Sequence, residues 1–156
     1  METNRKTCDI IRKSHDEKRK AGSAMSKNNC YTYFLIVGKF DPEEAARLLD
    51  IVPDKTVREG DLLRSGLPAP ESSLMLCRCA EYDVYTENQM RATVAPLADK
   101  IDVLNKLREE NDVEFFLEIV PSVTADEPTP CLAPPLDVID FCHATRTQLD
   151  IDLYVI

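Results

Sequence analysis

Two aspartates near the end of the chain are the first residues that could do chemistry. Asp150 and Asp152 lie in the segment LDIDLYVI, residues 149–156. Side chains of a β-strand alternate between its two faces, so both carboxylates would project from one face, close together. Such a pair can bind a cation, or can separate its two pKa values for acid–base work. A solvated sheet face, or ion pairs with Lys55 and Arg58, would explain the same residues without any site.

The segment 53–66, PDKTVREGDLLRSG, is the second candidate site. Gly60 indicates a turn, and Asp61 is suited to orient an arginine side chain. Long ordered loops in compact domains are often functional. An enzyme or a ligand-binding protein would require this loop to converge with the two aspartates in one pocket, and ordinary turn chemistry is the alternative. The candidate binding residues of the loop are Arg58, Gly60, Asp61 and Arg64.

Other residue patterns argue against several classes of site. His143 is the single histidine after residue 28, and its neighbour Cys142 would point about 100° away from it on a helix, so neither a catalytic triad nor a multi-histidine metal site is expected. The six cysteines lack zinc-binding spacing, and with no secretory signal they indicate reduced thiols in a cytoplasm. No glycine-rich nucleotide motif occurs. We therefore expect no catalytic residue, no metal site and no cofactor.

The charge of the chain is uneven. Residues 1–28 hold eight Lys and Arg against four Asp and Glu, whereas the remainder holds 11 against 24, which accounts for the net charge of −9. An acidic body of this kind repels nucleic acid and anionic membranes and attracts basic partners. No apolar run approaches the roughly 18 residues of a membrane span. We expect residues 1–28 to form a basic, disordered tail and residues 29–156 to form a single domain.

The elements that must position the candidate residues alternate along the chain. The patterns predict strands at 31–40, 73–82, 112–123 and 149–156, a short edge piece at 131–135, and helices at 41–52, 86–104 and 137–148. Pro96 should break the second helical segment, and Asp137 should cap the last helix. The strand–helix–strand order at both ends suggests a duplicated, ferredoxin-like arrangement. The predicted class is an α+β fold, a mostly antiparallel sheet with helices packed on one face.

The acidic stretch after the first strand is explained as a helix start. Asp41 can accept backbone hydrogen bonds as the N-cap, and Pro42 suits the first helical position, where no N–H is needed. Glu43 and Glu44 fall in the first turn, where the helix dipole favours negative charge. These four residues therefore have structural roles and are not assigned to a site.

The motifs at the two ends of the domain carry a resemblance. The first end has a strand followed by Gly38, Phe40, Asp41, Pro42, Glu44, Leu49, Ile51, Pro53, Arg58, Gly60 and Asp61, and the second has Asp150, Ile151, Asp152 and Tyr154. In this pattern residues 31–156 resemble the bacterial family catalogued as domain of unknown function 4279. Members often carry a tryptophan in the second strand region, and this chain has none. The resemblance implies no activity, although similar small acidic domains occur among bacterial immunity proteins.

The leading hypothesis is a non-enzymatic protein-binding domain, of the immunity type, whose acidic surface occupies a basic partner such as a toxin. The alternative is an enzyme, or a protein that binds a small ligand or metal, through the loop 53–66 and the Asp150/Asp152 pair, with Tyr154 beside them. A third interpretation is a domain that associates with itself through an edge strand or a helix face. We expect a monomer or a homodimer.

Overall fold

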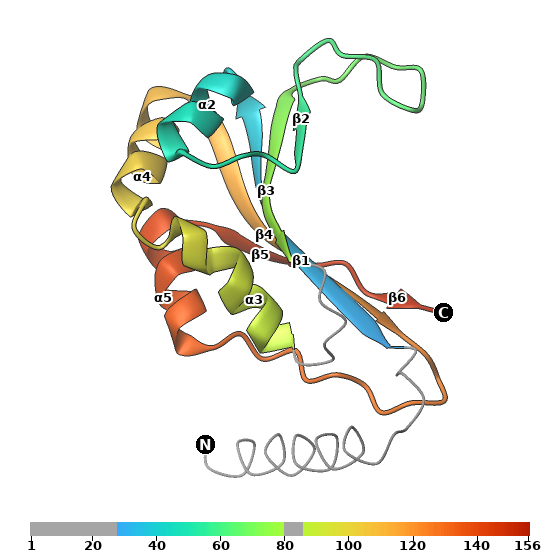
Figure 1. The fold of residues 1–156 in the computed structure, drawn as a ribbon. Helices are drawn as coiled ribbons and strands as arrows, with labels where there is room; N and C mark the ends of the chain where they lie inside the picture. The colour runs from blue at the N-terminus through green and yellow to red at the C-terminus, as the bar shows by residue number, and fades with distance from the viewer. Residues whose placement is uncertain (1–27, 80–85) are drawn as a thin grey trace.

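The structure is a computed structural model that describes residues 28–79 and 86–156 (Figure 1). Apart from Asn28, the predicted tail lies outside the described residues. The strands are β1 (Asn29–Lys39), β2 (Lys55–Val57), β3 (Ser72–Cys79), β4 (Asp112–Val123), β5 (Gln148–Ile151) and β6 (Tyr154–Val155). The helices are α2 (Pro42–Leu49), α3 (Thr86–Val94), α4 (Ile101–Glu110) and α5 (Leu136–Thr145), with the 3₁₀ turn η1 (Ala95–Leu97) between α3 and α4.

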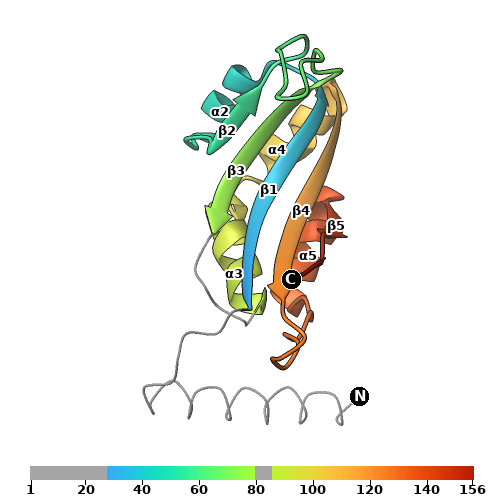
Figure 2. The same ribbon diagram turned by 90° about the vertical axis from the view of Figure 1, so that its right-hand side faces the viewer.

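The six strands form one sheet. Its order is β2–β3–β1–β4–β5, and β6 also pairs with β4. β1 is antiparallel to its neighbours β3 and β4, whereas β5 and β6 run parallel to β4. The four helices lie on one side of the sheet, and no described helix covers the other side (Figure 2). The predicted class, an α+β fold with a mostly antiparallel sheet and helices on one face, is confirmed.

The helical side of the sheet holds the core. Phe34 of β1 and Phe115 of β4 are almost fully buried, with ring centroids 5.7 Å apart, and Phe141 of α5 packs edge-on against Phe34 at 6.1 Å. One polar pair lies among these apolar side chains. The hydroxyl oxygens of Thr32 on β1 and Thr93 on α3 are 2.7 Å apart, and both residues are fully buried. This hydrogen bond links the central strand to α3.

The predicted start of α2 and the predicted break at Pro96 are confirmed, whereas α2 ends at Leu49, with Asp50 as its C-cap, and not at residue 52. The Asp41 carboxylate accepts hydrogen bonds from the backbone N–H groups of Glu43 and Glu44 at 3.0 and 3.1 Å, and these bonds hold the pKa of Asp41 below its ordinary value. The helical segment after residue 86 is broken where Pro96 was expected to break it, into α3, η1 and α4. None of the helices in the described ranges has the length and apolar character that a membrane span requires.

Three local predictions are wrong. Residues 131–135 form no strand, whereas Lys55–Val57, inside the predicted loop, pair with β3 as the short strand β2. Asp137 does not cap α5, because Pro135 occupies the N-cap position and the Asp137 carboxylate instead accepts hydrogen bonds from Arg91 of α3, the shorter at 2.8 Å. The second and third departures have one cause, because in each a neighbour distant in sequence supplies the partner, β3 for Lys55–Val57 and Arg91 for Asp137.

The duplicated, ferredoxin-like arrangement is also not found. In the first strand–helix–strand unit, β1 and β3 are antiparallel neighbours. In the last unit, β4 and β5 are parallel neighbours connected by α5. The two units share an order of elements but differ in the direction of the second strand, so they are not repeats of one topology.

The closing segment departs from expectation in a way that matters below. It forms two short strands, β5 and β6, rather than one. Its predicted apolar face, Leu149, Ile151, Leu153 and Val155, is present in the sequence but is between 41% and 73% exposed. The face is not part of the core.

Candidate functional site

The side of the sheet that faces away from the helices is called here the open face (Figure 2). It is formed by the alternate residues of the strands that do not enter the core. On β1 these include Tyr31, Tyr33 and Leu35, and across the β1–β4 ladder Glu118 lies opposite Tyr33 and Phe116 opposite Leu35. All five side chains are half-buried. The open face is therefore a continuous side-chain surface with a mixed aromatic and charged character.

Two tyrosines and an arginine form the aromatic part of this surface. The rings of Tyr31 and Tyr33 stack with centroids 6.1 Å apart. The guanidinium carbon of Arg78 lies 4.6 Å from the centroid of the Tyr31 ring, a cation–π distance. A β-bulge in β3 makes this contact possible, because Cys77 and Arg78 both stand opposite Tyr33 and Cys77 has a φ of 55°. Tyr31 of the open face thus already contacts one cation within the chain.

Three carboxylates lie beside the tyrosines. Glu118 stands opposite Tyr33, and Asp150 of β5 is the neighbour of Glu118 in the parallel ladder. Asp152 is held at two points, since its backbone N–H donates to a carbonyl oxygen of β4 at 3.0 Å and its carboxylate accepts from the Tyr154 hydroxyl at 2.7 Å. The structure therefore brings together the sequence-predicted residues Asp150, Asp152 and Tyr154.

Burial, and after it the crowding of negative charge, shows in the pKa values of Glu118 and Tyr33. Burial raises the pKa of the Glu118 carboxyl, and the charges of Asp150 and Asp152 raise it further. Burial, followed by the charge of Glu118, raises the pKa of Tyr33 to about 12. The hydrogen bond to Asp152 raises the pKa of Tyr154. An added positive charge would relieve this repulsion.

These six residues are called below the acidic–tyrosine cluster: Tyr31, Tyr33, Glu118, Asp150, Asp152 and Tyr154. Carboxylates form charge-assisted hydrogen bonds with ammonium and guanidinium groups, and tyrosine rings stack on guanidinium planes. In residues 28–79 and 86–156, no three His, Cys, Asp or Glu side chains are placed so that they could hold a metal ion. The chemistry that the cluster offers is the binding of organic cations such as lysine and arginine side chains.

The loop between β2 and β3 is held by turn contacts. The backbone N–H of Arg58 donates to the Asp61 carboxylate at 2.8 Å, and the Arg58 side chain donates to Glu43 of α2 at 2.9 Å. Gly60 has a φ of 87°, as expected at a turn, and its N–H donates to a backbone carbonyl at 2.9 Å. Arg64 is exposed. Arg58 therefore pairs with Glu43, and the predicted ion pair with the closing aspartates is absent from the described residues.

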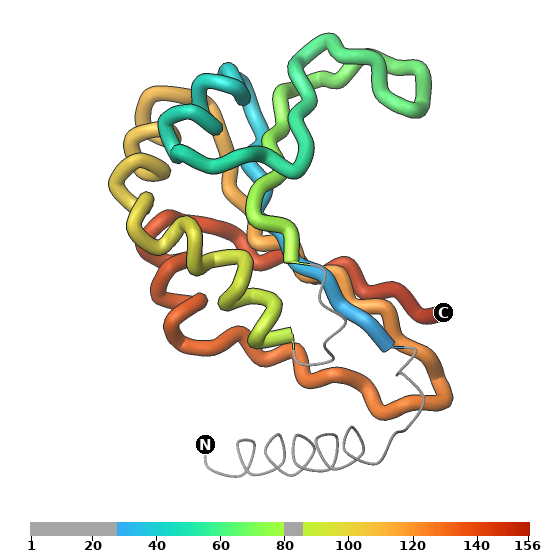
Figure 3. Tube along the Cα trace, in the orientation of Figure 1, coloured from blue at the N-terminus to red at the C-terminus, as the bar shows by residue number. Residues whose placement is uncertain are grey.

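The loop and the acidic–tyrosine cluster do not meet. The loop leaves from β2, at one edge of the sheet, and Asp150 lies on β5, at the other edge. Four strand spacings separate β2 from β5, roughly 19 Å at the usual spacing. The loop and the C-terminal segment also extend from different ends of the sheet (Figure 3). The sequence-predicted site residues thus fall into two separate groups rather than one pocket.

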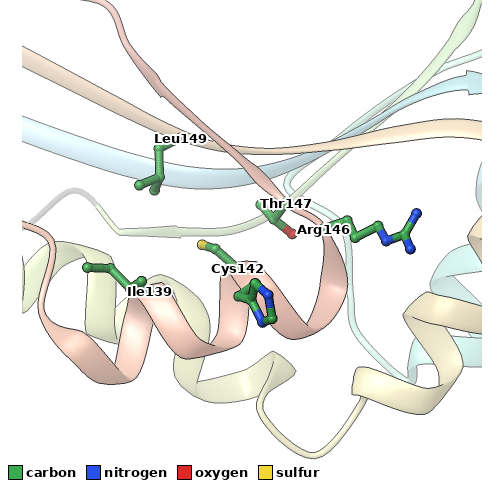
Figure 4. A pocket seen from close by; sticks show the side chains of 6 residues that line it. Ile139, Cys142, Arg146, Thr147 and Leu149 are labelled. Atoms are coloured by element: carbon green, nitrogen blue, oxygen red, sulfur yellow. The ribbon is translucent and has the colours of Figure 1, made fainter.

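A hollow lies between α5 and β5, on the helical side of the sheet. Its volume is about 620 Å³, and its lining residues are Ile139, Cys142, His143, Arg146, Thr147 and Leu149. In Figure 4, Ile139 and Leu149 border it from opposite sides, and the Arg146 side chain extends away from it. Burial raises the pKa of the Cys142 thiol to about 11, so this thiol remains protonated near neutral pH. A second groove of about 670 Å³ lies between α3, η1 and α5.

Sequence reasoning missed part of this region. Tyr31, Tyr33 and Glu118 were not predicted as site residues, and neither were Ile139 and Leu149. Period-two alternation in YTYFL and EFFLE was a usable signal, because it already placed Glu118 on the face opposite the core. The neighbours of each strand could not be read from that alternation.

Comparisons with known proteins identify one family. No curated protein and no solved structure matches the chain. Residues 28–156, which include every described element and the whole acidic–tyrosine cluster, match the family model described as "Domain of unknown function (DUF4279)", and the chain therefore belongs to this family.

Proposed function

We propose that the chain is a non-enzymatic protein-binding domain whose open face receives a basic partner. One observation carries the proposal: Glu118, Asp150 and Asp152 lie together with tyrosines on a sheet face that no described helix covers. In the described part of the chain, no lysine or arginine forms an ion pair with these three carboxylates. They remain available to a partner's cations.

The physical case rests on charge and on preorganisation. Glu118 and Asp150 lie on paired strands, and Asp152, between β5 and β6, is held by a backbone hydrogen bond and by the Tyr154 hydroxyl. Because these positions are preorganised, little conformational entropy is lost on binding. The net charge of −9 also speeds the approach of a basic protein at low ionic strength. The contact between Arg78 and Tyr31 illustrates within one molecule how an arginine of the partner would be held.

The narrower form of this proposal is an immunity-type protein that occupies a basic toxin. Small acidic inhibitors suit that task, because electrostatic steering raises the association rate with a basic target. The support for it is the acidity of the domain and the availability of its carboxylates.

A defined probe tests the general proposal. The full chain is titrated with fluorescent oligolysine and, separately, with oligoglutamate, at low and at high salt, and binding is followed by anisotropy. We expect oligolysine alone to bind, with an affinity that falls as salt screens the carboxylates.

A matched pair of variants locates the binding surface. The test variant removes the charges of the cluster, with Glu118→Gln, Asp150→Asn and Asp152→Asn. The control variant removes three charges from the exposed side of α4, with Asp102→Asn, Glu109→Gln and Glu110→Gln. We expect the first variant to lose most oligolysine affinity and the second to lose little. Equal losses in both variants would mean that only net charge matters, and the proposed surface would be wrong.

A further inference from the structure

The outer edge of β5 has unpaired backbone groups. β5 is an edge strand of the sheet. The N–H of Asp152 points toward β4, where it donates at 3.0 Å, and the N–H of Asp150, two residues earlier, points the same way. The N–H and C=O groups of Leu149 and Ile151 therefore point away from β4. Within ranges 28–79 and 86–156 they pair with no other strand. Such an edge is a template for an added strand.

One face of β5 offers apolar side chains. Leu149 and Ile151 are 41% and 44% exposed, and Ile139 of α5 is 41% exposed. Ile139 and Leu149 border the hollow of about 620 Å³ between α5 and β5 (Figure 4), which has room for aliphatic side chains. Contiguous exposed apolar side chains of this kind mark interaction sites.

The opposite face of β5 offers charge. Asp150 lies between Leu149 and Ile151 in sequence and projects from the other face, beside Glu118. A strand added outside β5 would lie about 4.8 Å away, and its side chains would alternate between the two faces. One set would enter the hollow, and the other set would reach Asp150 and Asp152. The segment that fits both faces alternates apolar with basic residues.

A second copy of the chain fits this edge less well. Antiparallel pairing of β5 with β5 of another molecule would bring Asp150 and Asp152 of the two copies together, and like charges placed opposite each other destabilise a sheet. Each chain also carries a net charge of −9. Charge complementarity therefore favours a basic segment from a different protein.

We propose that β5 is a strand-addition site, at which an extended partner segment of alternating apolar and basic residues joins the sheet. This inference rests on the proposed function, because the basic side chains of the added strand would bind the acidic–tyrosine cluster. Beyond the proposed function, it specifies that the partner binds at the outer edge of β5, that it pairs with the backbone of this strand, and that its sequence alternates apolar with basic residues.

The sequence pattern is tested with two short peptides of identical composition, blocked at both ends. One alternates valine with lysine, and the other places its lysines in one block and its valines in another. Both are titrated into the full chain by anisotropy at low salt. We expect the alternating peptide to bind at least about tenfold more tightly. Equal affinities would overturn the inference.

The edge itself is tested with two variants. Ile151→Pro removes an N–H that points away from β4, so it blocks strand addition while leaving the β4–β5 hydrogen bonds in place. Ile139→Asn removes an apolar wall of the hollow without touching the sheet, and Leu48→Asn, at an exposed leucine of α2, is its control. Circular dichroism verifies folding. We expect each test variant to weaken the alternating peptide about tenfold, and the control to have no effect.

The outcomes separate this inference from the proposed function. If oligolysine binds through the carboxylates while neither residue order nor Ile151→Pro has an effect, the strand-addition site is wrong and the proposed function stands. If neither oligolysine nor the alternating peptide binds, both fail. A homodimer in sedimentation equilibrium that Ile151→Pro dissociates would show that a second copy occupies β5, and this too would overturn the inference.

Discussion

Replacing Glu118 with glutamine is expected to stabilise the fold, although Glu118 belongs to the proposed binding surface. Glu118 neighbours Asp150 across the β4–β5 ladder, and burial together with the charges of Asp150 and Asp152 raises the pKa of its carboxyl. A like-charge pair across neighbouring strands costs roughly 0.2–1 kcal/mol. The variant should therefore gain roughly 0.2–1 kcal/mol of unfolding free energy at pH 7. Binding surfaces that concentrate one charge commonly lower stability in this way.

The gain should depend on pH. Because the pKa of Glu118 is higher in the folded than in the unfolded state, its contribution to stability is fully present below the unfolded-state pKa and is lost as pH rises through the folded-state pKa. The glutamine variant has no such loss. The difference between the two proteins should therefore be largest near neutral pH and should disappear in acid, where the carboxyl is protonated in both states.

Urea denaturation at neutral and at acid pH measures this difference. Glu114→Gln is the matched control, because Glu114 lies on the same strand and face but is exposed and stands opposite Val37. The control should change the unfolding free energy by less than about 0.5 kcal/mol. A loss of stability in Glu118→Gln at pH 7, or a gain that persists unchanged in acid, would refute the charge-repulsion account.

Two further predictions concern the fold. Thr32→Val or Thr93→Val alone should cost about 1–3 kcal/mol, because a buried hydroxyl loses its partner, whereas the double variant should cost less than the two single changes together. A double-mutant cycle in urea checks this, and strict additivity would contradict it. Gly38→Ala should cost at least about 2 kcal/mol, because Gly38 has a φ of 143° and a Cβ there would collide with the backbone of β4. Gly60→Ala, at a φ of 87° with open space around it, should cost less in the same urea denaturation assay, and equal costs would mean that the collision is relieved.

Local chemistry made several elements predictable. The start of α2 depends on Asp41 and Pro42, which act within one turn, and the break at Pro96 depends on a missing backbone N–H. The alternation of β4 separated its core residues from Glu118 because side-chain direction in a strand is set by position alone. In each case the cause and the effect lie within a few residues.

The candidate site was predicted only in part. The alternation of side chains in a strand predicted that Asp150 and Asp152 share a face. The structure places both beside Glu118 and Tyr33. Sequence reasoning could join these aspartates with the loop of Arg58 only as a hypothesis. The strand order separates the two groups, because it places β2 and β5 at opposite edges of the sheet. This order could not be predicted locally, since pairing between distant segments depends on the packing of the whole sheet.

The sequence by itself thus determined the fold class, the helix boundaries set by proline and by the Asp41 cap, and the side chains that share a strand face. The tertiary structure alone decided that β2 forms, that β5 lies parallel to β4 at an edge, and that Leu149 and Ile151 remain exposed. An apolar face predicts burial, but whether a helix reaches that face depends on where α5 packs. Contacts between segments distant in the sequence set the position of α5, and such contacts cannot be predicted from a local sequence pattern.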